Sequence, residues 1–596
     1  MPSFSKLVAA VAVGALSLVD AKACPPLGAV FPAPQAPGES KLVQTAATKL
    51  KAGLEERITS KFNTSAISIG VKSIHEDDPL FTYHFTPPNP GEGTDKVDEN
   101  TVFRIASGSK LFTVLAALLN SDIDFEASVL KYLPELNETA KEDEIFSLKW
   151  EDITVGSLAS HLSGIGVDLA QDLGIIGSAP WAQMGLPQFA KGEGPTCSGL
   201  PGTIPCTKKD LLEQVNLRPP VYGPFTNPVY SNVGIALLGL VVEAAAKKPF
   251  AEVLKRDIFD VVGMKNTYVG KTPLLRISLS LRANPHGMPL LPCSTEGILT
   301  NKFLSPAQTR KWMKPISNTA SWGYQVGAPW EILRGDNITV DGRLIDVYTK
   351  SGDLGLYHSQ TVLIPDYDIV ISIMSGGKEA SANQYVTSTV LSSVINALVP
   401  AIEKVGRDSA KEAFAGEYAD KETNSSISFK VDNGPGLVIN SWQIRGFDVL
   451  NHIGSYSFDA LESGKVEKSK YVDARVYPTN LNKKGQTAWR TVFDMTTSQQ
   501  DAEYESALFF KDGTCQSWFA QDRKVYDFLP LDEFVFIEGD EGVSTAVRNP
   551  AFNVTLTKVR EPGAKKAATN AAGQTRELNA ALGLGLAVLA AFMSMF

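Results

Sequence analysis

The sequence predicts an α+β domain followed by an all-β domain, and three observations support this prediction. Residues 41–60 carry apolar side chains at helical spacing, which is typical of an amphipathic helix. The alternating segments 66–71 and 80–85 flank a polar turn, which is the pattern of a β-hairpin. From about residue 410, short alternating segments separated by turn residues indicate an antiparallel β-sandwich or barrel. A helix, a hairpin and then a buried helix fit a mixed domain in which helices cover a sheet.

The composition is that of a globular chain with more than one domain. Its 596 residues are 43% hydrophobic and 20% charged, which is enough apolar material for cores of normal size. A net charge of −9 favours neither nucleic acid nor an anionic membrane as a partner. The chain contains no P-loop, H-E-x-x-H or C-x-x-C motif, so we expect no nucleotide, metal or other cofactor.

The N-terminus has the pattern of a secretory signal peptide. Lys6 precedes an apolar segment at 7–19, and the small-residue sequence at 21–23 fits a cleavage site, so residues 1–23 are the predicted signal. A short membrane anchor is the alternative. The apolar segment is short for an anchor, however, and a Pro-rich stretch at 24–39 follows it directly, which we interpret as a linker. We therefore expect a secreted protein.

In a secreted protein, sequons can accept glycans and cysteines can form disulfides. Five N-x-[ST] sequons lie near predicted turns or strand ends, at Asn63, Asn137, Asn337, Asn424 and Asn553. Cys197 and Cys206 flank a loop rich in Gly and Pro and are expected to form a disulfide. Cys24, Cys293 and Cys515 leave one cysteine unpaired, and the sequence does not say which.

The C-terminus has the pattern of a glycosylphosphatidylinositol (GPI) signal. Small residues at 567–573 are followed by a polar spacer at 574–579 and an apolar tail at 580–596. A single membrane-spanning helix is the alternative, but the tail is short and no Lys or Arg follows it. We expect attachment near Asn570 and therefore a cell-surface protein with a lipid anchor.

The first chemical motif is the S-x-x-K sequence at the start of a predicted buried helix. Residues 111–119 are apolar almost all round, and Ser107 and Lys110 lie one turn apart on one face. The helix N-terminus places backbone N–H groups beside the serine, and desolvation lowers the pKa of a buried lysine, so the pair suits a nucleophile and its base. Alone, the pair also fits a capping serine beside a solvated lysine. The same spacing occurs at Ser3 and at Ser375 without a buried helix.

The next segments offer weaker signals. Residues 153–164 are predicted to form a helix that ends at Gly164, with His161 as a packed side chain near its end. The loop-rich region 167–220 fits either the wall of a pocket or a surface insertion.

The second motif is Tyr230 and Asn232, on a predicted loop before the apolar helix that begins at residue 234. A tyrosine accepts a proton if nearby cations lower its pKa, and an asparagine offers neutral hydrogen bonds. A core tyrosine and a capping asparagine are the alternative.

The third motif, Lys350-Ser351-Gly352, is the only K-[ST]-G sequence and closes a strand-like segment. Two alternating segments follow at 360–364 and 369–374, so Lys350 is expected in an antiparallel sheet. The glycine would permit close approach of a substrate, and the next backbone N–H could stabilise an oxyanion. A strand-end turn with a solvated lysine is the alternative.

The order S-x-x-K, Y-x-N, K-[ST]-G resembles the serine β-lactamase and penicillin-binding-protein family. It is more similar to the branch of class C β-lactamases, DD-peptidases and esterases, where Y-x-N replaces S-D-N. Segments 129–134, 153–164 and 258–267 also resemble family elements, and the likeness extends from about 40 to 400. The whole chain resembles a secreted fungal subgroup with a β-rich C-terminal extension. The resemblance implies an antiparallel sheet flanked by helices, with a helical subdomain.

The resemblance also implies a role for each motif residue. Ser107 would be the acylated nucleophile and Lys110 its base partner. Tyr230 would shuttle the proton, and Asn232 would hold the carbonyl side of the substrate. Lys350 would complete the positive field that lowers the pKa of Tyr230.

Substrate contacts are expected from Ser351, Gly352 and Asp353, with the backbone N–H groups of Ser107 and Asp353 forming the oxyanion hole. Position 351 is Ser where the family commonly has Thr. A carboxylate at position 353 would disfavour anionic substrates such as penicillins. This departure favours neutral esters or amides.

The predicted organisation is a signal peptide (1–23), a Pro-rich linker (24–39), a β-lactamase-like domain (40–405), a β-rich domain (410–560) and a GPI tail (561–596). Strands of the β-rich domain are expected at 426–431, 437–442, 474–477, 491–495, 506–510, 534–537 and 552–559.

The predicted function is hydrolysis of a small-molecule ester or amide through an acyl-enzyme on Ser107. A transesterase or acyltransferase on the same scaffold and an inactive surface-binding protein are the alternatives. A Ser-His-Asp hydrolase is disfavoured because no G-x-S-x-G motif occurs. We expect no nucleic-acid partner and membrane contact only through the anchor, and the sequence leaves the oligomeric state open.

Overall fold

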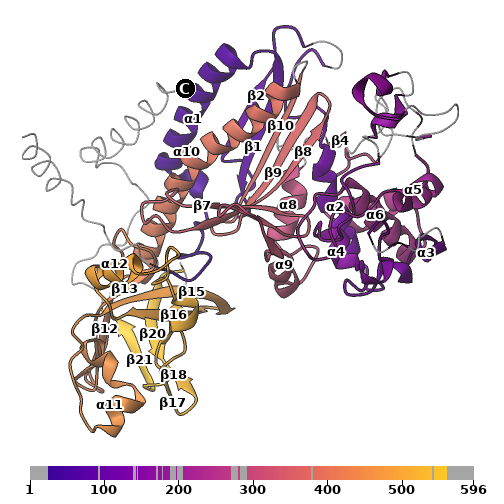
Figure 1. Ribbon diagram of the computed structural model, residues 1–596. Helices are drawn as coiled ribbons and strands as arrows, with labels where there is room; N and C mark the ends of the chain where they lie inside the picture. The colour runs from indigo at the N-terminus through magenta and orange to yellow at the C-terminus, as the bar shows by residue number, and fades with distance from the viewer. Residues whose placement is uncertain are drawn as a thin grey trace, which may run out of the picture.

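The computed structural model (Figure 1) contains an α+β domain and a β-barrel joined by one long helix. It describes residues 24–559 except 91–93, 139–142, 144, 170–171, 177–178, 188–195, 198–203, 205, 270–279, 282–290, 378–379 and 540–541. The predicted signal peptide, the predicted GPI tail and Asn570 lie outside the described residues.

An eight-stranded antiparallel sheet forms the centre of the first domain, in the order β2-β1-β10-β9-β8-β7-β6-β5. Its strands are β1 (Ser65–Ser73), β2 (Phe81–Phe85), β5 (Ser317–Asn318), β6 (Tyr324–Val326), β7 (Glu331–Gly335), β8 (Ile345–Leu354), β9 (Tyr357–Ile364) and β10 (Ile369–Gly377). The predicted hairpin is β1 and β2, and the segments expected at 360–364 and 369–374 lie in β9 and β10. Lys350 lies in β8, within an antiparallel sheet as expected.

Two helices cover one face of this sheet, α1 (Lys41–Lys61) and α10 (Ala380–Phe414), which run side by side in Figure 1. The apolar face of α1, with Leu50, Leu54 and Ile58, packs into one core with α10 and the sheet. Burial of this stripe is the reason the amphipathic pattern at 41–60 folds as a helix.

A helical subdomain covers the other face and carries the predicted buried helix. Its elements include η3 (Ala106–Gly108), α2 (Ser109–Leu119), α3 (Glu135–Glu138), α4 (Val155–Ala159), α5 (Lys208–Gln214), α6 (Asn232–Ala246), α7 (Phe250–Leu254), α8 (Leu291–Leu299) and α9 (Pro306–Trp312). A short ribbon pairs β3 (Phe103–Arg104) with β4 (Ser280–Leu281). Side chains of α2, α4 and α6 share a second core that reaches the sheet.

The helix expected at 153–164 is shorter than predicted, since α4 ends at Ala159. His161 adopts a left-handed backbone with φ of 61°, and its carbonyl oxygen accepts from the N–H of Val229 at 2.8 Å. The carbonyl is therefore turned toward a neighbouring loop, and the helix cannot continue. In the loop-rich region that follows, the predicted disulfide between Cys197 and Cys206 is present.

The C-terminal domain is a closed eight-stranded antiparallel barrel, which decides between the two architectures expected from the sequence. Its ring is β11 (Gly416–Asp420), β12 (Ser425–Lys430), β13 (Leu437–Ile444), β15 (Asp473–Lys483), β16 (Gln486–Asp494), β19 (Glu533–Glu538), β20 (Ser544–Asn549) and β21 (Val554–Lys558). The ring closes because β12 pairs with both β11 and β13. Its core is aromatic, with Trp442, Trp489, Phe534 and Phe536 fully buried.

The smaller elements of this domain lie in the connections between ring strands. They are β14 (Phe447–Asp448), α11 (Phe458–Glu462), α12 (Ser498–Ser506), α13 (Ser517–Ala520), β17 (Val525–Tyr526) and β18 (Leu529–Pro530).

The strand expected at 506–510 is wrong, because Ser506 ends helix α12. A capping box between Thr497 and Gln500 starts that helix, so local capping outweighs the alternating pattern that follows it. Phe509 is 98% exposed, and no strand partner covers it.

Helix α10 connects the two domains without a break. Ala410 and Phe414, near its end, lie in the barrel core, so the boundary predicted between 405 and 410 falls inside the helix. The helix is long and apolar enough to cross a membrane by composition, but about half of its apolar window is buried within the protein.

The segment 24–39, interpreted as a linker, packs onto the protein over part of its length. Val30 and Phe31 lie in the barrel core, and a disulfide joins Cys24 to Cys515. The structure thus settles the pairing that the sequence left open.

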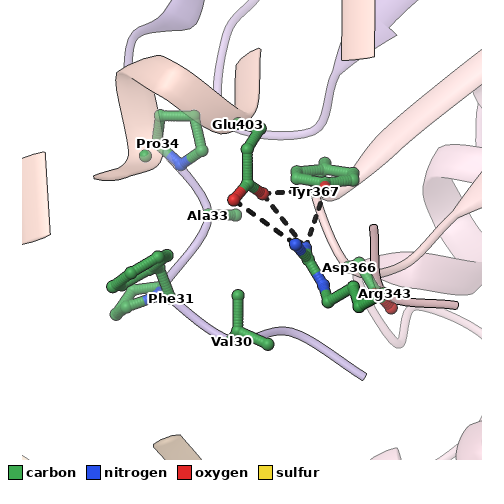
Figure 2. Close-up of a pocket in the computed structure, with 10 residues that line it drawn as sticks. Val30, Phe31, Ala33, Pro34, Arg343, Asp366, Tyr367 and Glu403 are labelled. Carbon is green, nitrogen blue, oxygen red and sulfur yellow. Dashed lines mark hydrogen bonds and ion pairs between the residues drawn. The ribbon is translucent and has the colours of Figure 1, made fainter. Parts of the chain in front are cut away.

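A buried network of charges crosses the junction beside this segment (Figure 2). The guanidinium of Arg343 lies 3.0 Å from the Glu403 carboxylate of α10 and 2.7 Å from the Tyr367 hydroxyl. Arg407, one turn after Glu403, bonds the same carboxylate at 2.9 Å and donates to the carbonyl of Asp432 in the barrel domain. Asp341 also pairs with both arginines, at 2.8 Å from Arg343 and 3.6 Å from Arg407. Two buried carboxylates, Glu403 and Asp341, therefore neutralise the two arginines that connect the domains.

We expect Glu403→Ala to destabilise the protein by about 3–5 kcal/mol, because it removes one of two buried carboxylates and leaves Asp341 alone with the guanidinium groups of Arg343 and Arg407. Glu412→Ala, at an exposed position of the same helix, is the matched control and should change stability by no more than about 0.5 kcal/mol. Urea unfolding of both variants measures the difference. Equal urea midpoints for the two variants would show that Glu403 contributes no more to stability than an exposed glutamate of the same helix.

Candidate active site

Ser107 and Lys110 form the centre of the site, at the junction of η3 and α2. Lys110 Nζ lies 2.8 Å from Ser107 Oγ, and the lysine is buried among the apolar residues of its helix. Burial, assisted by the charge of Lys350, lowers the pKa of Lys110 to about 7. The expectation of a buried lysine with a lowered pKa is confirmed. A substantial fraction of Lys110 is therefore neutral near pH 7 and able to accept a proton.

The backbone around Ser107 is held by strand β8. Ala106 has φ of 47°, an uncommon conformation for a residue with a side chain. A Cβ on Gly352 would lie 2.1 Å from the carbonyl oxygen of Ile105, so only glycine allows this approach. Ser359 Oγ of β9 donates to the same oxygen at 2.8 Å. Gly352 thus allows close approach of the backbone that precedes the nucleophile. The sequence analysis had expected it to allow close approach of a substrate.

Tyr230 completes the group around Ser107. Its hydroxyl lies 2.7 Å from Ser107 Oγ, and its ring centroid lies 5.0 Å from Lys110 Nζ and 5.2 Å from Lys350 Nζ. Two ammonium groups thus flank one aromatic ring, a favourable cation–π arrangement. The three motifs predicted from the sequence meet at this point.

The expected lowering of the Tyr230 pKa is wrong. Burial raises the pKa of Tyr230 to about 12, the hydrogen bond with Ser107 opposes this rise, and the carboxylates of Glu331, Asp353 and Asp168 add to it. Desolvation of the ring is the largest cause, and it outweighs the positive field expected from the lysines. Tyr230 is therefore a neutral phenol in the free protein and can donate or relay a proton.

Lys350 is almost completely buried and makes an ion pair that its motif does not reveal. Its Nζ lies 2.5 Å from Glu331 Oε1, and the other carboxylate oxygen of Glu331 accepts from the Ser351 N–H at 2.8 Å. Glu331 lies on β7, where it pairs in register with Thr349 of β8. No motif surrounds Glu331, and only the strand pairing brings it to Lys350.

Asn232 and Asp353 lie at the site without touching Ser107 in the hydrogen bonds that the structure describes. Asn232 begins α6, and its side-chain amide donates to Asp168 at 3.0 Å. The Asp353 carboxylate, partly exposed at the end of β8, pairs with Nδ1 of His358. Asn232 thus holds a second carboxylate, Asp168, near the site, which the sequence analysis missed.

No metal site emerges from the described ranges, which contain no group of three or more His, Cys, Asp or Glu side chains arranged to hold an ion.

Comparison with known proteins identifies the family. Residues 65–289 match the family model described as "Beta-lactamase", and residues 406–560 match the one described as "Beta-lactamase-like-like, C-terminal domain". The two matched regions assign the chain to the β-lactamase-like proteins. Ser107, Lys110 and Tyr230 lie inside the first matched region, and Lys350 lies between the two regions.

Fungal relatives of this β-lactamase-like chain match it over most of its length. A "Beta-lactamase-like protein" of Arthroderma benhamiae is 28% identical over 566 residues, which cover 87% of this chain and 93% of that protein. "Probable hydrolase clz13" of Cochliobolus lunatus is 24% identical and covers 90% of this chain and 92% of its own. Among solved structures, "EstCE1, a hydrolase with promiscuous acyltransferase activity" is 16% identical with a TM-score of 0.44, and covers 60% of this chain and 100% of its own.

His161 of the β-lactamase-like domain holds the loop that carries Tyr230. Its carbonyl oxygen accepts from the Val229 N–H at 2.8 Å, and its Nδ1 accepts from the Ser231 N–H at 3.1 Å. Its ring lies against the Tyr230 ring, with centroids 4.7 Å apart. Burial, with the charges of Lys350 and Lys110, lowers the pKa of His161 to about 3, so the imidazole is neutral. The expectation of a packed histidine is confirmed, and the structure adds that it positions Tyr230.

We expect His161→Leu to lower kcat/KM by about 10- to 100-fold, because Tyr230 would lose the support that places its hydroxyl at Ser107. His161→Asn keeps an acceptor for the Ser231 N–H and tolerates a positive φ, so it should recover most of the activity. Kinetics of ester hydrolysis and thermal melting of both variants provide the measurement. If the asparagine variant is no more active than the leucine variant at equal melting temperature, His161 does not act through this hydrogen bond.

Proposed function

We propose that this chain is a secreted serine hydrolase that cleaves a small-molecule ester or amide through an acyl-enzyme on Ser107. One observation carries the proposal: Ser107 Oγ lies within 2.8 Å of both Lys110 Nζ and Tyr230 Oη. A nucleophile beside a lysine of lowered pKa and a neutral phenol is the arrangement that covalent catalysis requires.

In the first half-reaction Ser107 Oγ bonds to the acyl carbon while neutral Lys110 takes the hydroxyl proton. The carbonyl oxygen becomes an oxyanion, for which we assign the backbone N–H groups of Ser107 and Asp353 as donors. The bond to the alcohol or amine then breaks, and the proton passes from Lys110 through the Tyr230 hydroxyl to the leaving group. The acyl group remains on Ser107.

In the second half-reaction water attacks the acyl-enzyme, and Lys110 takes the proton of the water. The bond to Ser107 Oγ breaks, Oγ recovers its proton, and the carboxylic acid leaves. An alcohol in place of water would make the protein a transesterase, since the chemistry at Ser107 is the same.

Exposure of the sequons supports the proposal that the protein is secreted and glycosylated. All five asparagines are exposed: Asn63, Asn137, Asn337, Asn424 and Asn553. Two disulfides fit an oxidising compartment. Loss of mass on enzymatic deglycosylation tests the glycans, and release of the protein from cells by a phosphatidylinositol-specific phospholipase tests the proposed GPI anchor at Asn570.

Acyl transfer to Ser107 can be tested directly by incubating the purified protein with a short-chain p-nitrophenyl ester. Mass spectrometry of the digested protein should find the acyl group on the peptide that contains Ser107, and Ser107→Ala should remain unlabelled. A label that turns over in water supports hydrolysis, and a stable label that an added alcohol releases supports the transferase. A folded protein that takes no label would favour an inactive surface-binding protein.

The rate should depend on pH through Lys110. Because the neutral amine is the base and its pKa is about 7, kcat/KM should fall below about pH 7 and level off above it. Tyr230→Phe should lower the rate but leave the midpoint of this acidic fall in kcat/KM near the same pH. The reason is that the Tyr230 hydroxyl, which the variant lacks, carries no charge in that pH range. A profile that stays flat between about pH 5 and about pH 9 would rule out Lys110 as the base.

A further inference from the structure

We propose that Glu331 makes this pocket select acyl donors that carry no negative charge. The inference rests on the proposed function and names the substrate class and the residue that sets it. Three features of the site support it, namely the ion pair of Lys350, the other carboxylates around Tyr230 and the position of Glu331 on a neighbouring strand.

The ammonium of Lys350 already has two partners within the protein, a carboxylate and a backbone carbonyl oxygen. It lies 2.5 Å from Glu331 Oε1 and donates to the Ser351 carbonyl oxygen at 2.8 Å, and the lysine side chain is only 1% exposed. The second oxygen of Glu331 is bound to the Ser351 N–H. A substrate carboxylate that approached the third motif would therefore find a neutral ion pair in place of a free cation.

The remaining charges around the nucleophile are mostly negative. Glu331, Asp168 and Asp353 act on Tyr230, and Glu331 and Asp168 act on Lys110. Lys110, which is partly neutral near pH 7, is the only cation that the described hydrogen bonds join to Ser107. An anionic acyl donor would be repelled by these carboxylates, whereas an uncharged donor would not.

Glu331 is suited to this role because it stands outside the proton-transfer group. It comes from β7, whereas Lys350 and Ser351 come from β8, and the described hydrogen bonds of its carboxylate are with those two residues. Replacement by glutamine keeps the shape and one acceptor for the Ser351 N–H but removes the charge. Such a variant frees the ammonium of Lys350 without removing a group that touches Ser107.

The test compares Glu331→Gln with the wild type on two esters of equal length, p-nitrophenyl butyrate and mono-p-nitrophenyl succinate. The wild type should prefer the neutral butyrate by at least about tenfold in kcat/KM, and the variant should shift this preference toward the succinate by about tenfold or more. Most of the change should appear in KM for the succinate, because Lys350 would then bind its carboxylate.

The pH profile gives a second readout. The Glu331 charge raises the pKa of Lys110, which burial and Lys350 lower, and Asp168 also raises it. Removal of the Glu331 charge should therefore move the acid limb of kcat/KM to lower pH. Glu296→Gln, which removes the carboxylate bound to Lys72 on β1, is the matched control for net charge and should change neither the preference nor the limb.

The outcomes separate this inference from the proposed function. A wild type that hydrolyses neither ester contradicts the proposed function and the inference with it. A wild type that hydrolyses butyrate, with a Glu331→Gln variant of unchanged preference, overturns the role of Glu331 alone. Loss of both activities in a variant that melts normally would also overturn it, since Glu331 would then be needed to place Lys350 and not to select substrates.

Discussion

The site depends on the burial of two lysines around one tyrosine ring. Lys110 and Lys350 flank Tyr230, and two buried ammonium groups so close together require a compensating charge. Glu331 supplies it to Lys350, which leaves Lys110 without a direct carboxylate partner among the described hydrogen bonds. Lys110, which lacks such a partner in the part of the chain that the structure describes, is the lysine whose pKa burial and the charge of Lys350 lower, so it can accept a proton.

The fold places this group by bringing backbone segments unusually close together. Strand β8 approaches the turn before Ser107 through Gly352, and His161 holds both residues that flank Tyr230. These contacts come from the central sheet and from the helical subdomain, so the site forms only when the two pack together. Positions fixed in this way are suited to a reaction that requires Ser107, Lys110 and Tyr230 within hydrogen-bonding distance.

The barrel contributes to this arrangement through α10 and not through residues at the site. The helix packs on the back of the sheet and ends in the barrel core, and Glu403 ties it to both domains through Arg343 and Arg407. The segment 24–39 packs at the same junction between the domains, where Val30 and Phe31 enter the barrel core and Cys24 is bonded to Cys515. The barrel therefore acts as a support for the helix behind the sheet.

The sequence by itself determined those features that depend on neighbours along the chain. Helix α1, the β1–β2 hairpin, six of the seven expected barrel strands and the one-turn spacing of Ser107 and Lys110 all follow from local periodicity, whereas strands β11 and β20 of the ring were not predicted. Only the tertiary structure decided the ion pair of Glu331, the support from His161, the Cys24–Cys515 bond and the raised pKa of Tyr230. The reason is physical: desolvation and Coulomb interactions depend on which distant segments pack together, and no local pattern records that packing.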